Sequence, residues 1–237
     1  MPAVLLDVGG IFHLPEHEKV LGAFARGGFA ARASDLDRAH YAGAARFTTD
    51  YEGELPWKEL WDDYLDAYVG ACGVTVDTRD DVLEHLHAEF SVGALWSRIV
   101  PGSLDALRDL AATGARLGVV SNADGLVAQR LREQEILQVG PGTGVAVECV
   151  IDSGDVGVLK PDARIFRIAL DALGVGPDDA WYVGDMPGID VVGARAAGIH
   201  PIAMDPHGFL RGRGYDVVAS LHDVAAAARG ERELGAA

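Results

Sequence analysis

Polar side chains directly follow several short apolar runs, at positions where they could act together on a charged group. The set contains a carboxylate, a hydroxyl, an amide, a lysine and an acidic pair. Its members are Asp7 in LLDVGG, Ser121 and Asn122 in VVSNAD, Lys160 in GVLKPD, and Asp185 with Asp190 in GDMPGID. A carboxylate can attack as a nucleophile, while donors and cations stabilise charge that develops on oxygen. Phosphoryl transfer needs this combination because its transition state spreads charge over three equatorial oxygens.

Apolar runs of strand length precede these side chains and indicate the elements that position them. Five segments have the pattern of buried strands: residues 3–9, 115–124, 146–155, 180–188 and 200–208. Helical periodicity occurs between them, over residues 103–112, 163–173 and 190–198. This alternation predicts an α/β fold with a doubly wound parallel sheet. Because ligands bind beyond the carboxyl ends of the strands in such sheets, we expect the polar set to meet at one edge.

The region between the first predicted strand and the rest of the sheet has a different pattern. Within residues 12–98 the sequence predicts helices at 18–25, 56–73 and 81–90, and no strand. We therefore predict a core formed by residues 1–11 and 99–237, with an inserted α-helical domain formed by residues 12–98. Trp57, Trp61 and Tyr64 follow the 3.6-residue period of the longest predicted helix, so we expect them to pack inside the insert.

Composition and charge narrow the class of protein. The chain has 237 residues, 49% of them hydrophobic, which suffices for a packed core. A formal net charge of −16 disfavours binding to nucleic acid or to an anionic membrane. The two cysteines do not suggest a disulfide framework, and no uncharged stretch reaches the roughly 18 apolar residues of a membrane span. We expect a cytoplasmic protein, monomeric or homodimeric, that acts on a small molecule.

The motifs LLDVGG, VVSNAD, GVLKPDARIF and YVGDMPGIDVVGARAAGI, in this order, resemble the haloacid dehalogenase superfamily of hydrolases. The resemblance extends from Asp7 to about Pro201, and the insert lies where that family carries its cap domain. It implies a Rossmann-like core in which Asp7 attacks phosphorus and forms an aspartyl-phosphate. Ser121 and Lys160 would hold the phosphoryl group as further catalytic residues.

The same resemblance implies Mg²⁺ as the cofactor and a small phosphorylated metabolite as the substrate. The implied metal ligands are Asp7, the backbone carbonyl of Gly9, Asp185 and Asp190. Carboxylate and carbonyl oxygens are the ligands that Mg²⁺ prefers. Further substrate contacts are expected from Gly9, Gly10, Asn122, Arg38 and Arg46.

Gly9 is a departure from the phosphatase pattern of this family. Phosphatases of the family commonly carry a second aspartate two residues after the nucleophile, which protonates the leaving oxygen and then activates water. The loss of general acid–base help costs about 10²–10⁴-fold in rate, and less for a leaving group of low pKa. His13, Glu16 and His17 are candidates to replace the missing acid and base.

Two other functions remain open at this stage. The dehalogenase branch of the family also lacks the second aspartate, but it needs no metal and lacks the GDxxxxD form present here from Gly184 to Asp190. The acidic pair therefore favours phosphate chemistry over cleavage of a carbon–halogen bond. The third possibility is a protein that binds a phosphorylated ligand without turning it over.

Overall fold

A six-stranded parallel sheet forms the centre of the protein. The computed structural model describes residues 1–48, 56–92 and 95–235. The strand order is β10-β9-β8-β1-β4-β7. Its strands are β1 (Ala3–Leu6), β4 (Leu117–Ser121), β7 (Cys149–Asp152), β8 (Ala180–Gly184), β9 (His200–Met204) and β10 (Asp216–Val218). Strand β1 lies between β4 and β8, so the chain order reverses beside it, as expected for a doubly wound sheet.

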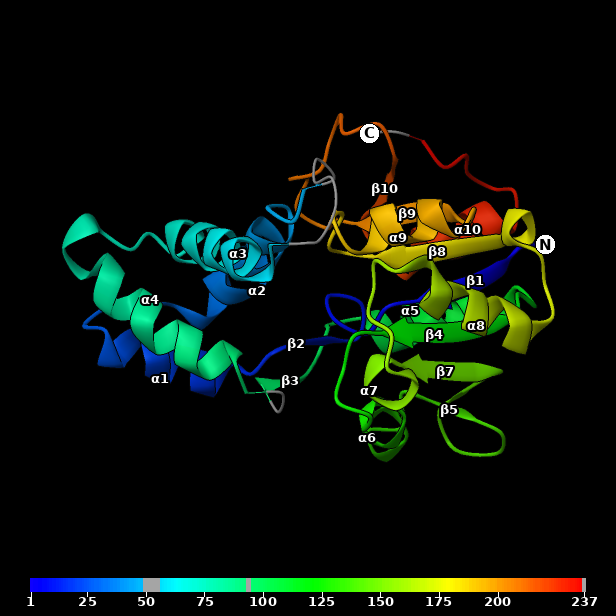
Figure 1. Cartoon of the computed structure of the whole chain (residues 1–237), viewed down its shortest axis with the longest axis horizontal. Helices are drawn as coiled ribbons and strands as arrows, with labels where there is room; N and C mark the ends of the chain where they lie inside the picture. The colour runs from blue at the N-terminus through cyan, green and yellow to red at the C-terminus, as the bar shows by residue number, and fades with distance from the viewer. Residues whose placement is uncertain (49–55, 93–94, 236–237) are drawn as a thin grey trace.

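Helices cover both faces of this sheet (Figure 1), which confirms the predicted fold class. One face packs against α5 (Ser103–Ala112), α6 (Val127–Glu133) and α10 (Leu221–Ala228) through side chains such as Leu107, Leu131 and Leu221. The other packs against α8 (Ala163–Leu173) and α9 (Asp190–Ala196). Short elements complete the core: α7 (Ser153–Val156), a 3₁₀ turn (Pro177–Asp179), and the paired strands β5 (Leu137–Val139) and β6 (Val145–Val147).

Four helices form a separate layer beyond one end of the strands (Figure 1). They are α1 (His17–Arg26), α2 (Ala33–Ala44), α3 (Trp57–Ala71) and α4 (Val76–Phe90). These helices enclose an apolar cluster of their own, which includes Phe24, Phe47, Tyr64 and Tyr68. The same cluster includes Ile189 of the loop after β8, so it also contacts the core. We call these four helices the helical layer.

The prediction that residues 12–98 contain no strand was wrong. Strands β2 (His13–Pro15) and β3 (Trp96–Ile99) form an antiparallel pair where the chain leaves the core and returns to it. Runs of three and four residues are too short to show a two-residue period. The predicted strand at 146–155 was also too long, since it contains β7, most of β6 and the start of α7. Helix α2 and strand β10 had not been predicted.

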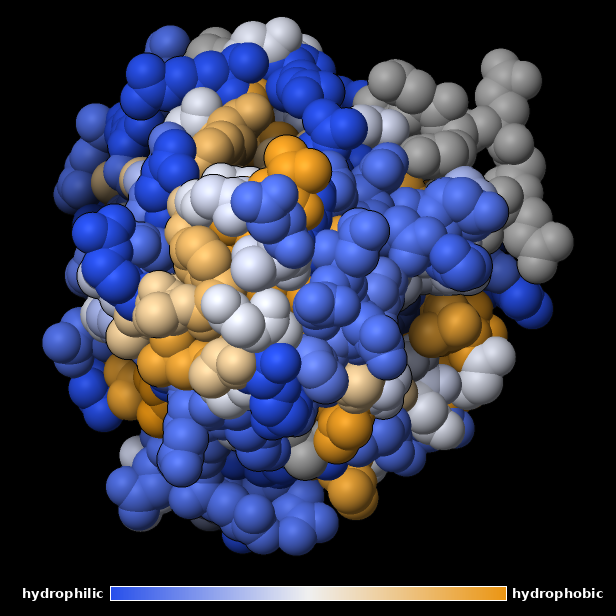
Figure 2. All heavy atoms as spheres, turned by 90° about the vertical axis from the view of Figure 1, so that its left-hand side faces the viewer, coloured by the Kyte–Doolittle hydropathy of each residue, from blue (hydrophilic) through white to orange (hydrophobic). Residues whose placement is uncertain are grey.

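The outer face of the helical layer is mostly hydrophilic. Figure 2 shows the end of the molecule that lies on the left of Figure 1, where hydrophilic residues interrupt the apolar ones that reach the surface. Among the residues that the structure describes, no helix is long and apolar enough to cross a membrane.

Candidate active site

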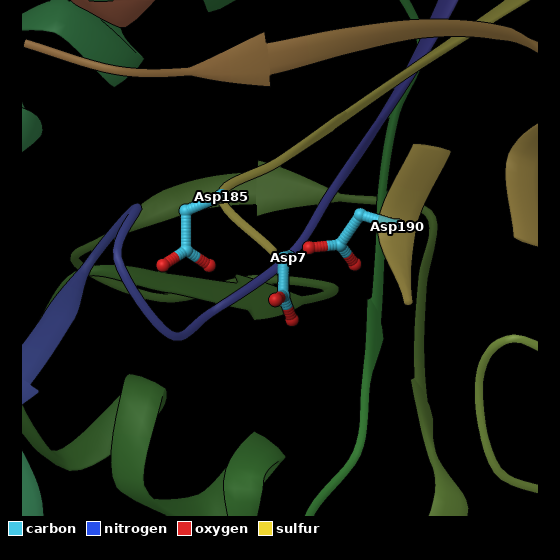
Figure 3. A group of neighbouring side chains, drawn as sticks. All are labelled: Asp7, Asp185 and Asp190. Carbon is cyan, nitrogen blue, oxygen red and sulfur yellow. The ribbon is translucent and has the colours of Figure 1, made fainter. Parts of the chain in front are cut away.

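Three carboxyl groups meet at the carboxyl edge of the sheet (Figure 3). Asp7 directly follows β1, Asp185 directly follows β8, and Asp190 begins α9. One carboxylate oxygen from each lies within 4.8 Å of the others, and all three residues are buried. Like charges this close in a buried site repel one another unless cations balance them. Ser121, the last residue of β4, lines the same site.

Glycines allow these carboxyl groups to approach the backbone. Gly10 has a φ of +65°, and a Cβ there would lie 2.3 Å from Cγ of Asp185. A Cβ on Gly184 would lie 2.3 Å from Cγ of Asp190. Neither position has room for a side chain. By contrast, a Cβ on Gly9 would meet only the ring of Trp96, at 3.9 Å.

Lys160 is the buried cation of the site. Its Nζ lies 2.8 Å from Oδ1 of Asp7 and 2.8 Å from Oδ1 of Asp190. It also donates to the hydroxyl of Tyr182 at 2.8 Å. The side chain of Asn122 holds the lysine backbone, because Oδ1 accepts from the Lys160 N–H at 2.7 Å and Nδ2 donates to the Lys160 carbonyl at 3.1 Å. A single ammonium thus bridges two carboxylates.

The two carboxylates of the acidic pair differ in how their oxygens are satisfied. Both oxygens of Asp190 have donors: Lys160 and the Tyr182 hydroxyl at Oδ1, and the backbone N–H of Met186 at Oδ2, 2.9 Å away. Neither oxygen of Asp185 has an aligned hydrogen-bond partner among the described residues. Nε2 of His40 lies 2.9 Å from its Oδ2, but without hydrogen-bond alignment. Asp185 is therefore the carboxylate with unused lone pairs.

Burial and mutual repulsion shift the titration of these groups. Burial raises the pKa of the Asp7 carboxyl to about 7; Lys160 opposes this rise, while Asp190 and Asp185 add to it. Burial also raises the pKa of Asp185. For Lys160, burial alone would lower the pKa, but the charges of Asp190 and Asp7 raise it overall. Three buried carboxyl groups thus share one ammonium, and their raised pKa values reflect the cost of ionising them together.

A cavity of about 310 Å³ opens above these groups. Asp7, Gly9, Ser121, Lys160 and the acidic pair form its polar end. Its other walls come from the helical layer, the β2–β3 pair, the start of α6 and the loop after β8. The side chains of those walls include Trp57, Trp61, Trp96, Val127, Met186 and Ile189. A ligand in this cavity would therefore contact both the core and the helical layer.

The three candidates for a replacement acid and base lie in different environments. His13 lines the cavity, is 2% exposed, and pairs through Nε2 with Oε1 of Gln134 at 2.5 Å. Burial lowers its pKa, so the imidazole is neutral near pH 7. Glu16 accepts a hydrogen bond from Ser97 at 2.7 Å, and His17 pairs with Asp37 at 2.8 Å. Of the three, only His13 is among the described residues that line the cavity.

The structure does not bring the two predicted arginines to the cavity. Arg38 lies over the ring of Phe209, with 4.9 Å from Cζ to the ring centroid, and Arg46 is exposed. Neither belongs to the described lining. The arginine that does line the cavity is Arg130 on α6, which had not been predicted.

Trp57 and Trp61 line the cavity, although their spacing predicted packing inside the insert. Trp61 lines the cavity and also packs inside the insert, since its ring centroid lies 5.3 Å from that of Phe47 and 5.1 Å from that of Tyr64. The four-residue spacing places both tryptophans on one helix face, but it does not reveal that part of this face borders a cavity. Tyr182 was also missed, because it contacts the site from within an apolar strand.

Comparison with known proteins places this site in a family. A model of the haloacid dehalogenase-like hydrolases matches residues 3–198, and the chain therefore belongs to that family. This confirms the resemblance found in the sequence motifs.

Curated relatives include haloacid dehalogenase-like hydrolase domain-containing proteins and named phosphatases, which match over part of their length. A phosphoserine phosphatase of Thermus thermophilus is 49% identical over 67 residues, which are 28% of this chain and 27% of that protein. A phosphoglycolate phosphatase of Rhodospirillum rubrum is 38% identical over 123 residues, which are 52% of this chain and 46% of that protein. The chain thus spans half or less of the length of these two relatives.

Among solved structures, the fold is similar to that of a HAD phosphatase from Thermococcus onnurineus. The TM-score is 0.56 with 22% sequence identity, over 98% of this chain and 100% of that chain. Identity at this level shows a common fold, and the chemistry must be argued from the site itself.

Proposed function

We propose that this hydrolase is a Mg²⁺-dependent phosphatase of a small phosphorylated metabolite, acting through an aspartyl-phosphate on Asp7. The observation that carries the proposal is the meeting of a carboxylate nucleophile, a buried lysine and an acidic pair at one end of a cavity. A phosphoryl group needs cations and donors around its oxygens, which Lys160 and a metal ion held by the acidic pair would supply.

The reaction has two steps. First, a carboxylate oxygen of Asp7 bonds to phosphorus while the bond from phosphorus to the leaving oxygen breaks; the leaving oxygen keeps the electron pair and takes up a proton. Second, a water oxygen bonds to phosphorus, the bond from phosphorus to Asp7 breaks, and the water loses a proton. The products are an alcohol, inorganic phosphate and the regenerated carboxylate. Lys160, 2.8 Å from Oδ1 of Asp7, opposes the rise in the pKa of the nucleophile and so favours its ionised form.

The residues present fit a divalent cation. Neither buried oxygen of Asp185 has an aligned hydrogen-bond partner among the described residues, although Nε2 of His40 lies 2.9 Å from Oδ2. One oxygen of each of Asp7, Asp185 and Asp190 lies within 4.8 Å of the other two. All are hard oxygen ligands, which suit Mg²⁺. We propose that Asp7, Asp185, Asp190 and the carbonyl of Gly9 hold it. When bound, Mg²⁺ would neutralise phosphoryl charge and the excess charge of the carboxylates.

We propose that the helical layer acts as a cap over the site. The hydroxyl of Tyr41 on α2 donates to the carbonyl of Gly10 at 2.6 Å. The N–H of Gly188 donates to the carbonyl of Phe47 at 2.7 Å, which ties the loop after β8 to the segment that follows α2. These contacts support exclusion of water from the cavity during the reaction. The cytoplasmic location and the monomeric or homodimeric state remain predictions from the sequence.

A direct assay separates the proposed function from the two alternatives. A phosphatase releases phosphate from acetyl phosphate or 4-nitrophenyl phosphate with Mg²⁺ and stops when EDTA removes the metal. Metal-independent release of halide from 2-haloacids would instead establish a dehalogenase. Tight binding of phosphate esters without turnover would establish a binding protein.

Mg²⁺ should stabilise the fold, and more strongly at high pH than at low pH. The pKa of Asp7, which faces Lys160, Asp190 and Asp185, is raised from 3.8 to about 7 by burial. In the metal-free protein its contribution to stability is therefore present below pH 4 and lost as the pH rises toward 7. Metal binding offsets that loss. At a Mg²⁺ concentration of 100 times its Kd at pH 8, the free energy of unfolding should rise by about 2.7 kcal/mol at pH 8, and the same concentration should raise it by less at pH 5, where the Kd is higher.

Urea unfolding with Mg²⁺ or EDTA at the two pH values measures this difference. Asp185→Asn should remove most of the effect of Mg²⁺. Equal stabilisation at both pH values, or stabilisation that survives Asp185→Asn, would contradict the assignment of the site.

Gly9→Asp should increase turnover of simple alkyl phosphates by about 10²-fold, the lower range of general acid catalysis. The substitution fits, because its Cβ would lie 3.9 Å from the ring of Trp96. The comparison is Gly10→Ala, which we expect to lose stability because its Cβ would lie 2.3 Å from Cγ of Asp185 at a φ of +65°. Steady-state kinetics with glycerol phosphate measures the gain. An unchanged rate in a folded Gly9→Asp protein would show that the missing acid is not the limitation.

A further inference from the structure

The walls of the cavity away from the phosphate end are aromatic and apolar. Trp57 and Trp61 face it from α3, and Trp96 faces it from β3. Val127, Met186 and Ile189 complete this part of the lining. Indole rings favour flat, apolar partners, which they contact face to face or edge to face.

The polar groups in the same lining are already paired within the protein. Arg130 donates to both carboxylate oxygens of Asp124, at 2.8 and 2.7 Å. His13 pairs with Gln134, and Asn122 pairs with the backbone of Lys160. Apart from Lys160 at the phosphate end, no described cation of the lining is therefore left for a carboxylate on the substrate. Phosphoglycolate and phosphoserine, which name two relatives, both carry such a carboxylate.

Gly9 adds a constraint on the leaving group. With no side chain at this position, no acid stands there to protonate the departing oxygen. An oxygen that leaves easily as an anion is then required. A phenolic oxygen meets this requirement, since the phenol of tyrosine has a pKa of about 10 and alkyl alcohols are far weaker acids.

We propose that the substrate is an aryl phosphate monoester, whose aromatic ring lies among the tryptophans while its phosphoryl group lies on Asp7 and Lys160. This inference rests on the proposed phosphatase function and names its substrate class. The bond between phosphorus and the phenolic oxygen breaks as Asp7 bonds to phosphorus, and the phenolate departs with the electron pair and takes a proton from water. A cavity of about 310 Å³ is at the small end for ligand sites, which suits one or two fused rings.

Four substrates separate the requirement for an aromatic ring from the requirement for a good leaving group. Phenyl phosphate has the ring and the good leaving group, benzyl phosphate has only the ring, acetyl phosphate has only the good leaving group, and phosphoglycolate has neither. We expect kcat/KM to be highest for phenyl phosphate, with benzyl phosphate at least about 10²-fold lower because general acid help is missing. Acetyl phosphate should show a higher KM than phenyl phosphate because it lacks the ring.

Variants test the aromatic wall. Trp57→Leu should raise KM for phenyl phosphate by about 3–10-fold and leave KM for acetyl phosphate within twofold, as expected from the loss of one aromatic contact. The matched control is Trp181→Leu, a tryptophan of β8 outside the cavity, which should preserve both values. Gly9→Asp should reduce the ratio of kcat/KM for phenyl phosphate to kcat/KM for benzyl phosphate.

The outcomes distinguish the two levels of the proposal. If none of the four substrates is hydrolysed with Mg²⁺ in a reaction that needs Asp7, the phosphatase function fails. If phosphoglycolate is hydrolysed as well as phenyl phosphate, or if Trp57→Leu affects phenyl and acetyl phosphate equally, the phosphatase function stands and the aryl substrate class is overturned.

Discussion

Replacing Asp7 by asparagine should lower kcat by at least about 10³-fold and leave the fold intact. The amide keeps the shape of the carboxyl group but is neutral and a poor nucleophile, so no bond to phosphorus forms. The fold should tolerate the change because Asp7 is one of three carboxyl groups packed together, and burial already raises its pKa to about 7. A neutral group there reduces repulsion within the site.

Two measurements check this expectation. Steady-state kinetics with acetyl phosphate gives the fall in kcat, and acid quenching with a radiolabelled phosphoryl donor detects the aspartyl-phosphate. The control is Asp171→Asn, an exposed aspartate on α8 that is not among the described residues lining the cavity, which should keep full activity and full labelling. An Asp7→Asn protein that still forms a labelled intermediate would require another nucleophile.

Replacing Lys160 by methionine should lower the free energy of unfolding by about 3–5 kcal/mol at pH 8, as expected when one partner is removed from a buried ionic group. Lys160 is 2% exposed and contacts both Asp7 and Asp190 at 2.8 Å, so its removal leaves two buried carboxylates without their cation. At pH 5 the loss should be smaller. Without the lysine the pKa of Asp7 rises further, and its protonated form no longer needs a counter-charge.

The double variant Lys160→Met/Asp190→Asn tests the cause of that loss. If unpaired charge is responsible, the second substitution should recover part of the stability at pH 8. Urea unfolding without metal measures the stability of the single and the double variant, each at pH 8 and at pH 5. A loss that is equal at both pH values would indicate that the lysine contributes packing alone.

Much of the fold and the polar end of the site follow from local sequence. Asp7, Ser121 and Asp185 each end or directly follow an apolar run, and parallel strands bring such positions to one edge. Lys160 lies in a loop between β7 and α8, so its position was indicated by its motif rather than by a period. These features depend on residues that are close together in the chain, so they can be predicted from a single sequence.

The remaining parts depend on contacts between distant segments. Strands β2 and β3 pair residues more than 80 positions apart and are too short to show a period. The predicted contacts Arg38 and Arg46 were chosen by residue type, whereas the fold turns Trp57 and Trp61 toward the cavity. His40 reaches Asp185 from α2, a helix that had not been predicted. The local sequence pattern does not indicate which face of an inserted helix contacts the core.

Strands β2 and β3 carry both crossings of the chain between the core and the helical layer, which we propose to be a cap, and they form one antiparallel pair. The chain leaves and re-enters the core through these two strands, and backbone hydrogen bonds join them, so the crossings cannot swing independently. Their register shifts between Leu14 and Pro15, where the ladder is weakest and bends most easily. His13 is held on the core side by Gln134, and Trp96 packs with the helical layer. Because Trp96 lies on β3 and packs with the helical layer, any movement of that layer relative to the core would displace one wall of the cavity from the phosphate end.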